Sequence, residues 1–334
     1  MTKRITNMKK GWLTVILSLI LCLVLGFSIT GSLVTGDAWA DDGGRTYPVM
    51  HPDRETLDKW IAAYNSAPLA HVETEGFQVP LPRGSRNLLS HLKYTPVERN
   101  QGDCGNCWAW AGTGCLGIAL DVQEGIRDRL SVQYLNSNYN GGSGSDWACC
   151  GGNLFGVADF YTATGMAIPW SNANASWQDG SRCCGDHLTS VPAITISTTP
   201  NYPISSIDDV TIQTHTVAPA TAIANIKNVL NQGKAIWFGF FLPNSFAWSD
   251  FFDFWGTRDE SVVYDIDKFC GEPYNSDPNE GGGHAVLCVG YNDDDPNNSY
   301  WIMLNSWGTT DGRPNGLFRI NMDMAYDGMN PPYY

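Results

Sequence analysis

The sequence has few charged residues, and basic residues are the scarcer kind. Charged residues make up 16% of the 334 residues, with 20 Lys and Arg against 34 Asp and Glu, which gives a formal net charge of −14. Nucleic-acid binding depends on clustered Lys and Arg, so this balance argues against a nucleic-acid partner. Internal repeats and long low-complexity tracts are also lacking. The length is instead sufficient for a substantial core, in one large domain or two lobes.

Histidine is scarce as well, with six in the chain, and no group of ligands has the spacing of a metal site. Cys104 and Cys107 form a C-x-x-C pair, but a zinc site needs a second pair with similar spacing. The cysteines at 149–150 and 183–184 are adjacent instead. The run NDDDPNN at 292–298 lacks a spaced calcium-ligand loop and is more typical of a hairpin turn. We therefore expect no metal and no other cofactor.

The N-terminus has the layout of a secretory signal peptide. Four basic residues within the first ten precede a largely apolar stretch at 12–27, and Ala38 and Ala40 lie at the −3 and −1 positions of a cut before Asp41. We expect residues 1–40 to be removed and the protein to be secreted or periplasmic, with no stable membrane partner afterwards. The stretch at 26–40 is long for a cleavage region, so an uncleaved membrane anchor is the alternative.

Export changes the interpretation of the cysteines. Nine remain after residue 40, and because an oxidising compartment favours disulfides, the odd number leaves at least one thiol over. The segment QGDCGNCWAW at 101–110 could then hold a redox pair, or one bridged cysteine beside one reactive thiol. The redox interpretation requires Cys104 and Cys107 to bond each other.

Two blocks further along the chain favour a reactive thiol with a partner base. His284 opens GGGHAVLCVGY, where a glycine run leads into an apolar strand, and Asn305 ends the apolar strand in YWIMLNSWG. A Cys, a His at a strand start and an Asn at a strand end can form a nucleophile, a base and an orienting amide. A redox pair would leave both blocks unexplained.

These blocks, in this order, resemble the papain-like cysteine peptidases of the cathepsin type, the C1 family. Residues 104–108 match its C-G-[SA]-C-[WY] signature, with Asn106 where Ser or Ala is usual. Gln101 and Gly102 precede the signature as in the family, and CCGGN at 149–153 is similar to the family's C-x-G-G segment. The resemblance covers about residues 80 to 325.

The resemblance implies an α+β, two-lobed fold with the active-site cleft between the lobes. The catalytic domain is expected at 80–334, with a helical lobe at about 80–190 and a strand-rich, barrel-like lobe at about 191–334. Residues 242–283 make the distance from Cys107 to His284 longer than is usual. We interpret them as a surface loop with a small aromatic cluster; the alternative is a flap over the cleft.

The resemblance also assigns the catalytic roles. Cys107 is the nucleophile and forms a thiolate–imidazolium pair with His284 at neutral pH. Asn305 orients the imidazole, and Trp307 shields that hydrogen bond from water and belongs to the substrate-binding residues. The side chain of Gln101 and the backbone N–H of Cys107 form the oxyanion hole.

Three further residues are expected to bind substrate. By resemblance, Gly151 and Gly152 hydrogen-bond the substrate backbone, because glycine permits close approach. Leu154 lines the P2 pocket, so apolar or aromatic P2 side chains are expected.

The family position of Cys104 implies a disulfide with Cys149. Cys150 is expected to bond Cys183 or Cys184, and of these we adopt Cys184. The partners of three cysteines stay open: Cys115, Cys270 and Cys288.

Residues 41–79 are expected to form a short pro-segment and linker. The stretch HPDRETLDKWIAAYN at 51–65 is expected to be helical, with one apolar face formed by Leu57, Trp60, Ile61 and Tyr64. This face is too small for the helix to fold alone, so it should dock on the domain. Pro-segments of this family commonly lie along the cleft. We predict a latent precursor that gains activity on cleavage between Val72 and Pro82, the alternative being a mere tether.

The predicted function is that of an exported, monomeric cysteine endopeptidase acting on proteins or peptides. One alternative is an acyl or peptidyl transferase that uses the same site to pass the acyl group to an amine. The other is a non-catalytic, peptidase-like binding protein. The presence of all four expected catalytic residues argues against the second alternative: Gln101, Cys107, His284 and Asn305.

Overall fold

The structure is a computed structural model that describes residues 48–73, 79–185, 187–277 and 279–326, all within the unit formed by residues 36–334. The expected signal peptide, residues 1–40, lies outside the described residues, together with parts of the expected pro-segment. Among the residues that are described, no helix is both long enough and apolar enough to span a membrane.

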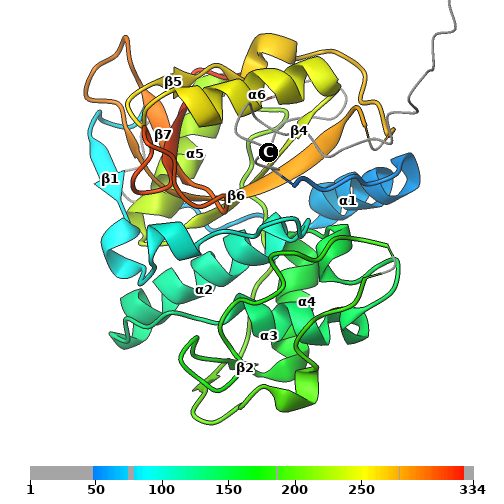
Figure 1. Ribbon diagram of the computed structural model, residues 1–334. Helices are drawn as coiled ribbons and strands as arrows, with labels where there is room; N and C mark the ends of the chain where they lie inside the picture. Colours follow the sequence, from blue (N-terminus) through cyan, green and yellow to red (C-terminus); the bar gives the residue numbers. More distant parts are fainter. Residues whose placement is uncertain (1–47, 74–78, 186, 278, 327–334) are drawn as a thin grey trace, which may run out of the picture. The chain divides into compact units, whose positions relative to one another are not determined.

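A helical lobe follows the Cys107 motif. It contains α2 (Cys107–Glu124), α3 (Val132–Asn138) and α4 (Leu154–Thr164), and a short pair of strands, β2 (Met166–Ala167) and β3 (Tyr202–Pro203). Helix α2 contacts α3 and α4, and it also contacts strands β4 (Ile236–Leu242) and β6 (Gly282–Asn292) of the second lobe (Figure 1). The helix that begins at Cys107 therefore lies where the two lobes meet.

The second lobe is built on a six-stranded sheet. Its strands follow the order β1 (Ser85–Asn87), β6, β7 (Tyr300–Leu304), β8 (Leu317–Asn321) and β5 (Val263–Tyr264), and β4 pairs with β6 off this path. Helix α5 (Pro219–Asn231) contacts β6. Every residue of β6 from Gly282 to Tyr291 is buried, which explains its continuous apolar run. The two lobes form the α+β fold predicted from the sequence.

The interpretation of residues 242–283 as a surface loop is wrong. They contain α6 (Ser245–Thr257), whose Trp248, Phe251 and Trp255 are almost fully buried in the core of the second lobe. Large aromatic side chains recur at positions 248, 251, 252 and 255, the spacing of one helix face, and this pattern predicts a helix. The extra chain length before His284 is thus filled partly by a core helix.

The expected pro-segment contains α1 (Arg54–Ser66), which corresponds to the helical stretch predicted at residues 51–65. Asp53 caps its first turn by accepting a hydrogen bond from the backbone N–H of Thr56 at 2.7 Å. Leu57 is fully buried, and the ring of Trp60 lies 6.5 Å from that of Phe241 in β4. The apolar face of α1 therefore packs on the rest of the structure.

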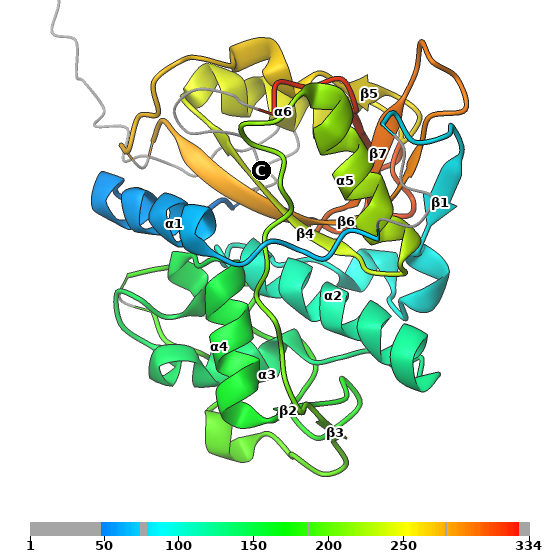
Figure 2. The same ribbon diagram turned by 180° about the vertical axis from the view of Figure 1, so that it is seen from behind.

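After α1 the chain runs along the second lobe towards α5 (Figure 2). The backbone N–H of Ala70 donates to the carbonyl of Thr211 at 2.8 Å. The side chain of Asn228 in α5 bonds both backbone groups of Glu73, at 3.0 and 3.1 Å. Polar contacts thus continue the docking of this segment beyond its helix.

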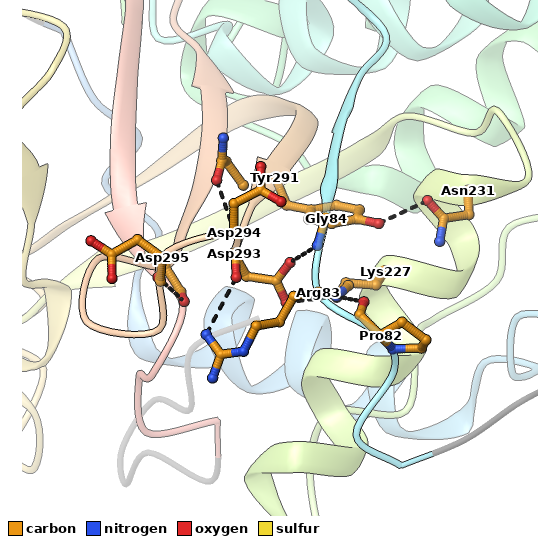
Figure 3. Close-up of polar contacts among 11 residues, drawn as sticks. Pro82, Arg83, Gly84, Lys227, Asn231, Tyr291, Asp293, Asp294 and Asp295 are labelled. Atoms are coloured by element: carbon orange, nitrogen blue, oxygen red, sulfur yellow. Dashed lines mark hydrogen bonds and ion pairs between the residues drawn. The ribbon is translucent and has the colours of Figure 1, made fainter.

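A buried ion pair holds the start of the expected catalytic domain (Figure 3). Lys227 of α5 is 1% exposed and donates to the carboxylate of Asp293 at 2.6 Å and to the carbonyl of Pro82 at 2.8 Å. Asp293 also accepts the backbone N–H of Gly84 at 2.8 Å. These contacts use no residue before Pro82, so loss of the preceding chain would leave them intact.

Candidate active site

Three elements bring the predicted catalytic residues together. Cys107 is the first residue of α2, His284 lies near the start of β6, and Asn305 directly follows β7. Strands β6 and β7 pair, and Nε2 of His284 lies 2.8 Å from Oδ1 of Asn305. The Cys107 sulfur accepts a hydrogen bond from the backbone N–H of Ala285 at 3.4 Å, so it lies beside the residue that follows His284.

The hydrogen bonds determine which imidazole nitrogen is available. Oδ1 of Asn305 also accepts the backbone N–H of Ser306 at 2.8 Å, which identifies this atom as the amide oxygen. His284 therefore donates to it through Nε2–H. The other ring nitrogen, Nδ1, is buried and has no hydrogen-bond partner among the described residues. In the neutral ring, Nδ1 is thus the basic atom.

Aromatic rings enclose the imidazole. Trp307 stacks on His284 with ring centroids 4.4 Å apart, and Phe240 meets the imidazole edge-on at 5.7 Å. Phe251 of α6 packs in turn on Trp307 at 5.7 Å. These rings limit the access of water to the bond between His284 and Asn305. The contribution of α6 was not expected from the sequence.

The side chain of Gln101 is fixed as a hydrogen-bond donor. The hydroxyl of Ser306 donates to its Oε1 at 2.6 Å. Its Nε2 donates to the backbone carbonyls of Cys104, at 2.7 Å, and Pro48, at 3.3 Å. The side-chain amide of Gln101 therefore directs its N–H groups at two backbone carbonyls.

Residues 48–51 cover these groups. Met50 and Gly283 exchange two backbone hydrogen bonds, both of 2.8 Å, and the Met50 sulfur lies 3.5 Å from the backbone nitrogen of Gly152. Four site residues consequently have almost no exposed surface: Gln101, Cys107, His284 and Asn305. No sequence pattern marks residues 48–51, because so short an extended segment has no periodicity.

Known proteins are similar to this chain in sequence and in fold. The papain family cysteine protease profile matches residues 265–330. Cathepsin B-like CP3 of Giardia intestinalis is 31% identical over 236 residues, covering 67% of this chain and 64% of that protein. Senescence-specific cysteine protease SAG12 of Arabidopsis thaliana is 26% identical over 231 residues, covering 69% and 54%. Digestive procathepsin L2 of Tenebrio molitor shares the fold, with a TM-score of 0.51 and 18% identity, covering 84% and 73%.

The chain belongs to the papain family of cysteine peptidases. It spans about half to two thirds of the length of the two curated relatives, 54% and 64%. Membership explains why a Cys, a His and an Asn occur in this order and on these elements.

Burial acts against charge on both members of the Cys–His pair in this papain-like protein. Burial raises the pKa of the Cys107 thiol to about 12, although backbone N–H groups oppose the rise. Burial also lowers the pKa of His284 to about 4, against the opposing effect of the Asn305 hydrogen bond. Both shifts disfavour the thiolate–imidazolium pair while these residues are buried. The cause is the exclusion of water, which would stabilise both charges.

Gly151 and Gly152 lie directly against the covering segment. Gly151 has a φ of 106°, and a Cβ there would lie 3.2 Å from the Cβ of Met50. A Cβ at Gly152 would lie 2.5 Å from the ring of Trp108. Both positions therefore require glycine.

Leu154, at the start of α4, lines a cavity of about 460 Å³ together with Ala158 and Trp237. The indole N–H of Trp237 donates to the carbonyl of Trp108 at 3.0 Å, which fixes this ring as a wall of the cavity. The apolar face of α1 lines the same cavity. Nothing in the sequence distinguishes Trp237 from its neighbours, because it lies within the apolar run AIWFGFF at 235–241.

Two disulfides are present among the described cysteines, Cys104–Cys149 and Cys150–Cys184. These are the pairs adopted from the sequence. The first ties the loop before α2 to the segment before Gly151, and the second leaves Cys183 exposed and free. Four other described cysteines are free: Cys107, Cys115, Cys270 and Cys288.

Proposed function

We propose that the protein, once its pro-segment is removed, is an exported cysteine endopeptidase that acts on proteins or peptides as a monomer. One arrangement carries the proposal. The free Cys107 thiol lies beside the strand that carries His284. Nε2 of this histidine is engaged by Asn305, and its Nδ1 has no hydrogen-bond partner among the residues that the structure describes. Such a ring can take a proton from the thiol and later give it to a leaving amine.

Each step of the proposed reaction uses these groups. The thiol proton moves to Nδ1 of His284, and the thiolate attacks the carbonyl carbon of the scissile bond. The resulting oxyanion is stabilised by the Gln101 amide and the backbone N–H of Cys107, each worth on the order of 3 kcal/mol in the transition state. The imidazolium protonates the leaving amine as the C–N bond breaks. Water, deprotonated by His284, then hydrolyses the thioester and restores the thiol.

We further propose that the precursor is latent. Residues 48–51 supply the carbonyl that Gln101 binds and the backbone groups that pair with Gly283, so a substrate cannot reach Cys107. The sequence has no cysteine between residues 41 and 79, so no disulfide retains the pro-segment after cleavage between Val72 and Pro82. Lys227 would continue to hold the new N-terminal region.

The experiment compares precursor and trimmed protein. The trimmed protein should bind one equivalent of an epoxide thiol inhibitor and hydrolyse a peptide library, with a preference for apolar or aromatic P2 side chains; the precursor should be much slower in both. Preferential acyl transfer to an added amine would identify a transferase, and inhibitor labelling without turnover would rule out a peptidase. Equal kcat/KM for the two forms would rule out latency.

The location is a separate part of the proposal. Disulfides persist in oxidising compartments, so the two bridges fit an extracytoplasmic protein. We propose that residues 1–40 direct export into the periplasm or the medium. N-terminal sequencing of the exported protein should find Asp41 as its first residue; retention of residues 1–40 in a membrane fraction would identify an anchor.

A further inference from the structure

Asn106, the residue at which this chain departs from the family signature, has its own buried partners. It precedes Cys107, is fully buried, and donates from Nδ2 to Oδ1 of Asn136 in α3 at 2.9 Å. Asn136 donates in turn from Nδ2 to Oδ2 of Asp179 at 2.6 Å, and both of these residues are also fully buried. Three side chains thus connect a carboxylate to the residue beside the nucleophile.

The carboxylate sets the orientation of both amides. An ionised carboxylate only accepts hydrogen bonds, so Asn136 presents its NH2 group to Asp179. The Oδ1 of Asn136 then faces Asn106 and accepts a hydrogen bond from the NH2 group of Asn106. The Oδ1 of Asn106 is buried and has no hydrogen-bond partner among the described residues. A buried oxygen without a hydrogen-bond partner is unfavourable, so this orientation needs the support of the other two side chains.

Asp179 is well suited to remain ionised. Gln133 and Thr189 donate to its Oδ2 at 2.6 and 2.7 Å, and the backbone and hydroxyl of Ser190 both donate to its Oδ1 at 2.6 Å. Burial acts to raise the pKa of Asp179, but these hydrogen bonds outweigh burial and lower the pKa below its ordinary value. The fixed end of the connection is therefore a charged, acceptor-only group.

The neighbour of Asp179 holds the same loop at a second point. The carbonyl of Gly180 accepts the backbone N–H of Asp103 at 2.7 Å. A Cβ on Gly102, whose φ is 64°, would lie only 1.9 Å from that carbonyl oxygen. Residues 179–180 therefore support the loop 101–106 directly at Asp103 and through Asn136 at Asn106.

We propose that Asp179 is a positioning residue for the nucleophile: through Asn136 and Asn106 it holds the start of α2 so that the Cys107 sulfur faces His284. Helix α2 has no side-chain hydrogen bond from its N-cap, which is Asn106 itself. The hydrogen bonds from Asn106 to Asn136 of α3, and from Asn136 to Asp179, take the place of a side-chain cap, because they hold the N-cap residue Asn106 in position. This inference rests on the proposed peptidase function.

The test uses the trimmed protein and follows alkylation of Cys107 by iodoacetamide, located by peptide mapping, beside peptide hydrolysis. Asp179→Asn should slow alkylation and lower kcat, each about tenfold, with KM changed less than twofold. The matched control Ser190→Ala removes a donor to Asp179 outside the connection to Asn106, and it should keep both rates within twofold. Alkylation needs no peptide turnover, so it decides the role of Asp179 even if peptide hydrolysis is not found.

A second variant covers the case in which Asp179→Asn does not fold. Asn106→Ala cuts the connection at its last link and keeps every hydrogen bond of Asp179, so the thermal midpoint should change little while alkylation slows to a similar extent. The double variant should be no slower than the slower single variant, because both changes break one connection. Wild-type alkylation and kcat in folded Asn106→Ala, or in folded Asp179→Asn, would overturn the proposal.

Discussion

Cys104 and Cys107 lie three positions apart, and both are fully buried, yet their surroundings make them different groups. Cys104 is bonded to Cys149 and holds the loop before α2. Cys107 is free, begins a helix and accepts a backbone N–H from β6. Helix N-termini and backbone donors favour a thiolate once water can reach it, so the second cysteine suits chemistry and the first suits structure.

Replacing each cysteine should separate these roles. Cys107→Ala should abolish hydrolysis and inhibitor labelling while the thermal midpoint is retained, because little volume is lost. Cys104→Ala should lower the free energy of unfolding by about 2–5 kcal/mol through loss of the disulfide. Denaturant unfolding and kinetic assays of both variants check this. Peptide mapping that finds Cys104 bonded to Cys107 in the active form would reverse the assignment.

The stabilising role of the buried ion pair between Lys227 and Asp293, which lies outside the candidate active site, can also be tested by substitution. Lys227→Met should lower the free energy of unfolding of the trimmed protein by about 3–5 kcal/mol, because it leaves the buried Asp293 carboxylate without its cation. The matched double variant, Lys227→Met with Asp293→Asn, removes that charge and should recover part of the loss. Urea unfolding curves provide the measurement. No recovery in the double variant would show that the charge is not the cause.

At the scale of elements, the three blocks with candidate catalytic residues stood out because each combines a polar or reactive side chain with a boundary visible in the sequence. His284 follows a glycine run, and Asn305 ends an apolar run. The helix α6 had a signal, its aromatic spacing, but the unusual chain length suggested an insertion. Residues 48–51 had no such signal in the sequence, because their conformation depends on contacts with the backbones of Gly283 and Gly152.

Residues 48–51, which cover the site, are held by few contacts, so their position should depend on Met50. The side chain is 2% exposed, and truncation of a buried Met typically costs about 2–5 kcal/mol. Met50→Ala should therefore speed inhibitor labelling of the precursor by at least about tenfold. Lys59→Ala, on the exposed face of α1, is the matched control and should leave labelling unchanged. Identical labelling rates for Met50→Ala and wild-type precursor would show that residues 48–51 do not control access.

At the scale of the whole molecule, the cover joins groups from both lobes. Met50 contacts Gly152 of the helical lobe and Gly283 of the strand-rich lobe, while α1 lines a cavity formed by both. Removing this segment would therefore return water to Cys107 and His284 together. A pro-segment is what the sequence predicts, but it could not predict the burial of Cys107 and His284, since residues 48–51 lie more than fifty positions away along the chain.

Acid should weaken the covered state through His284. Its pKa is about 4 under the cover, against an ordinary value of 6.5, so below pH 6.5 an uncovered imidazole binds a proton that the covered one does not. A depressed pKa contributes stability above the ordinary value, and this is lost as the pH falls from 6.5 to 4, on the order of 3 kcal/mol in all. We expect the inhibitor-labelling rate of the precursor, divided by that of the trimmed protein at the same pH, to rise across this window. The ratio corrects for the intrinsic pH dependence of the thiol, and a constant ratio between pH 7 and pH 4 would show that protonation of His284 does not open the cover.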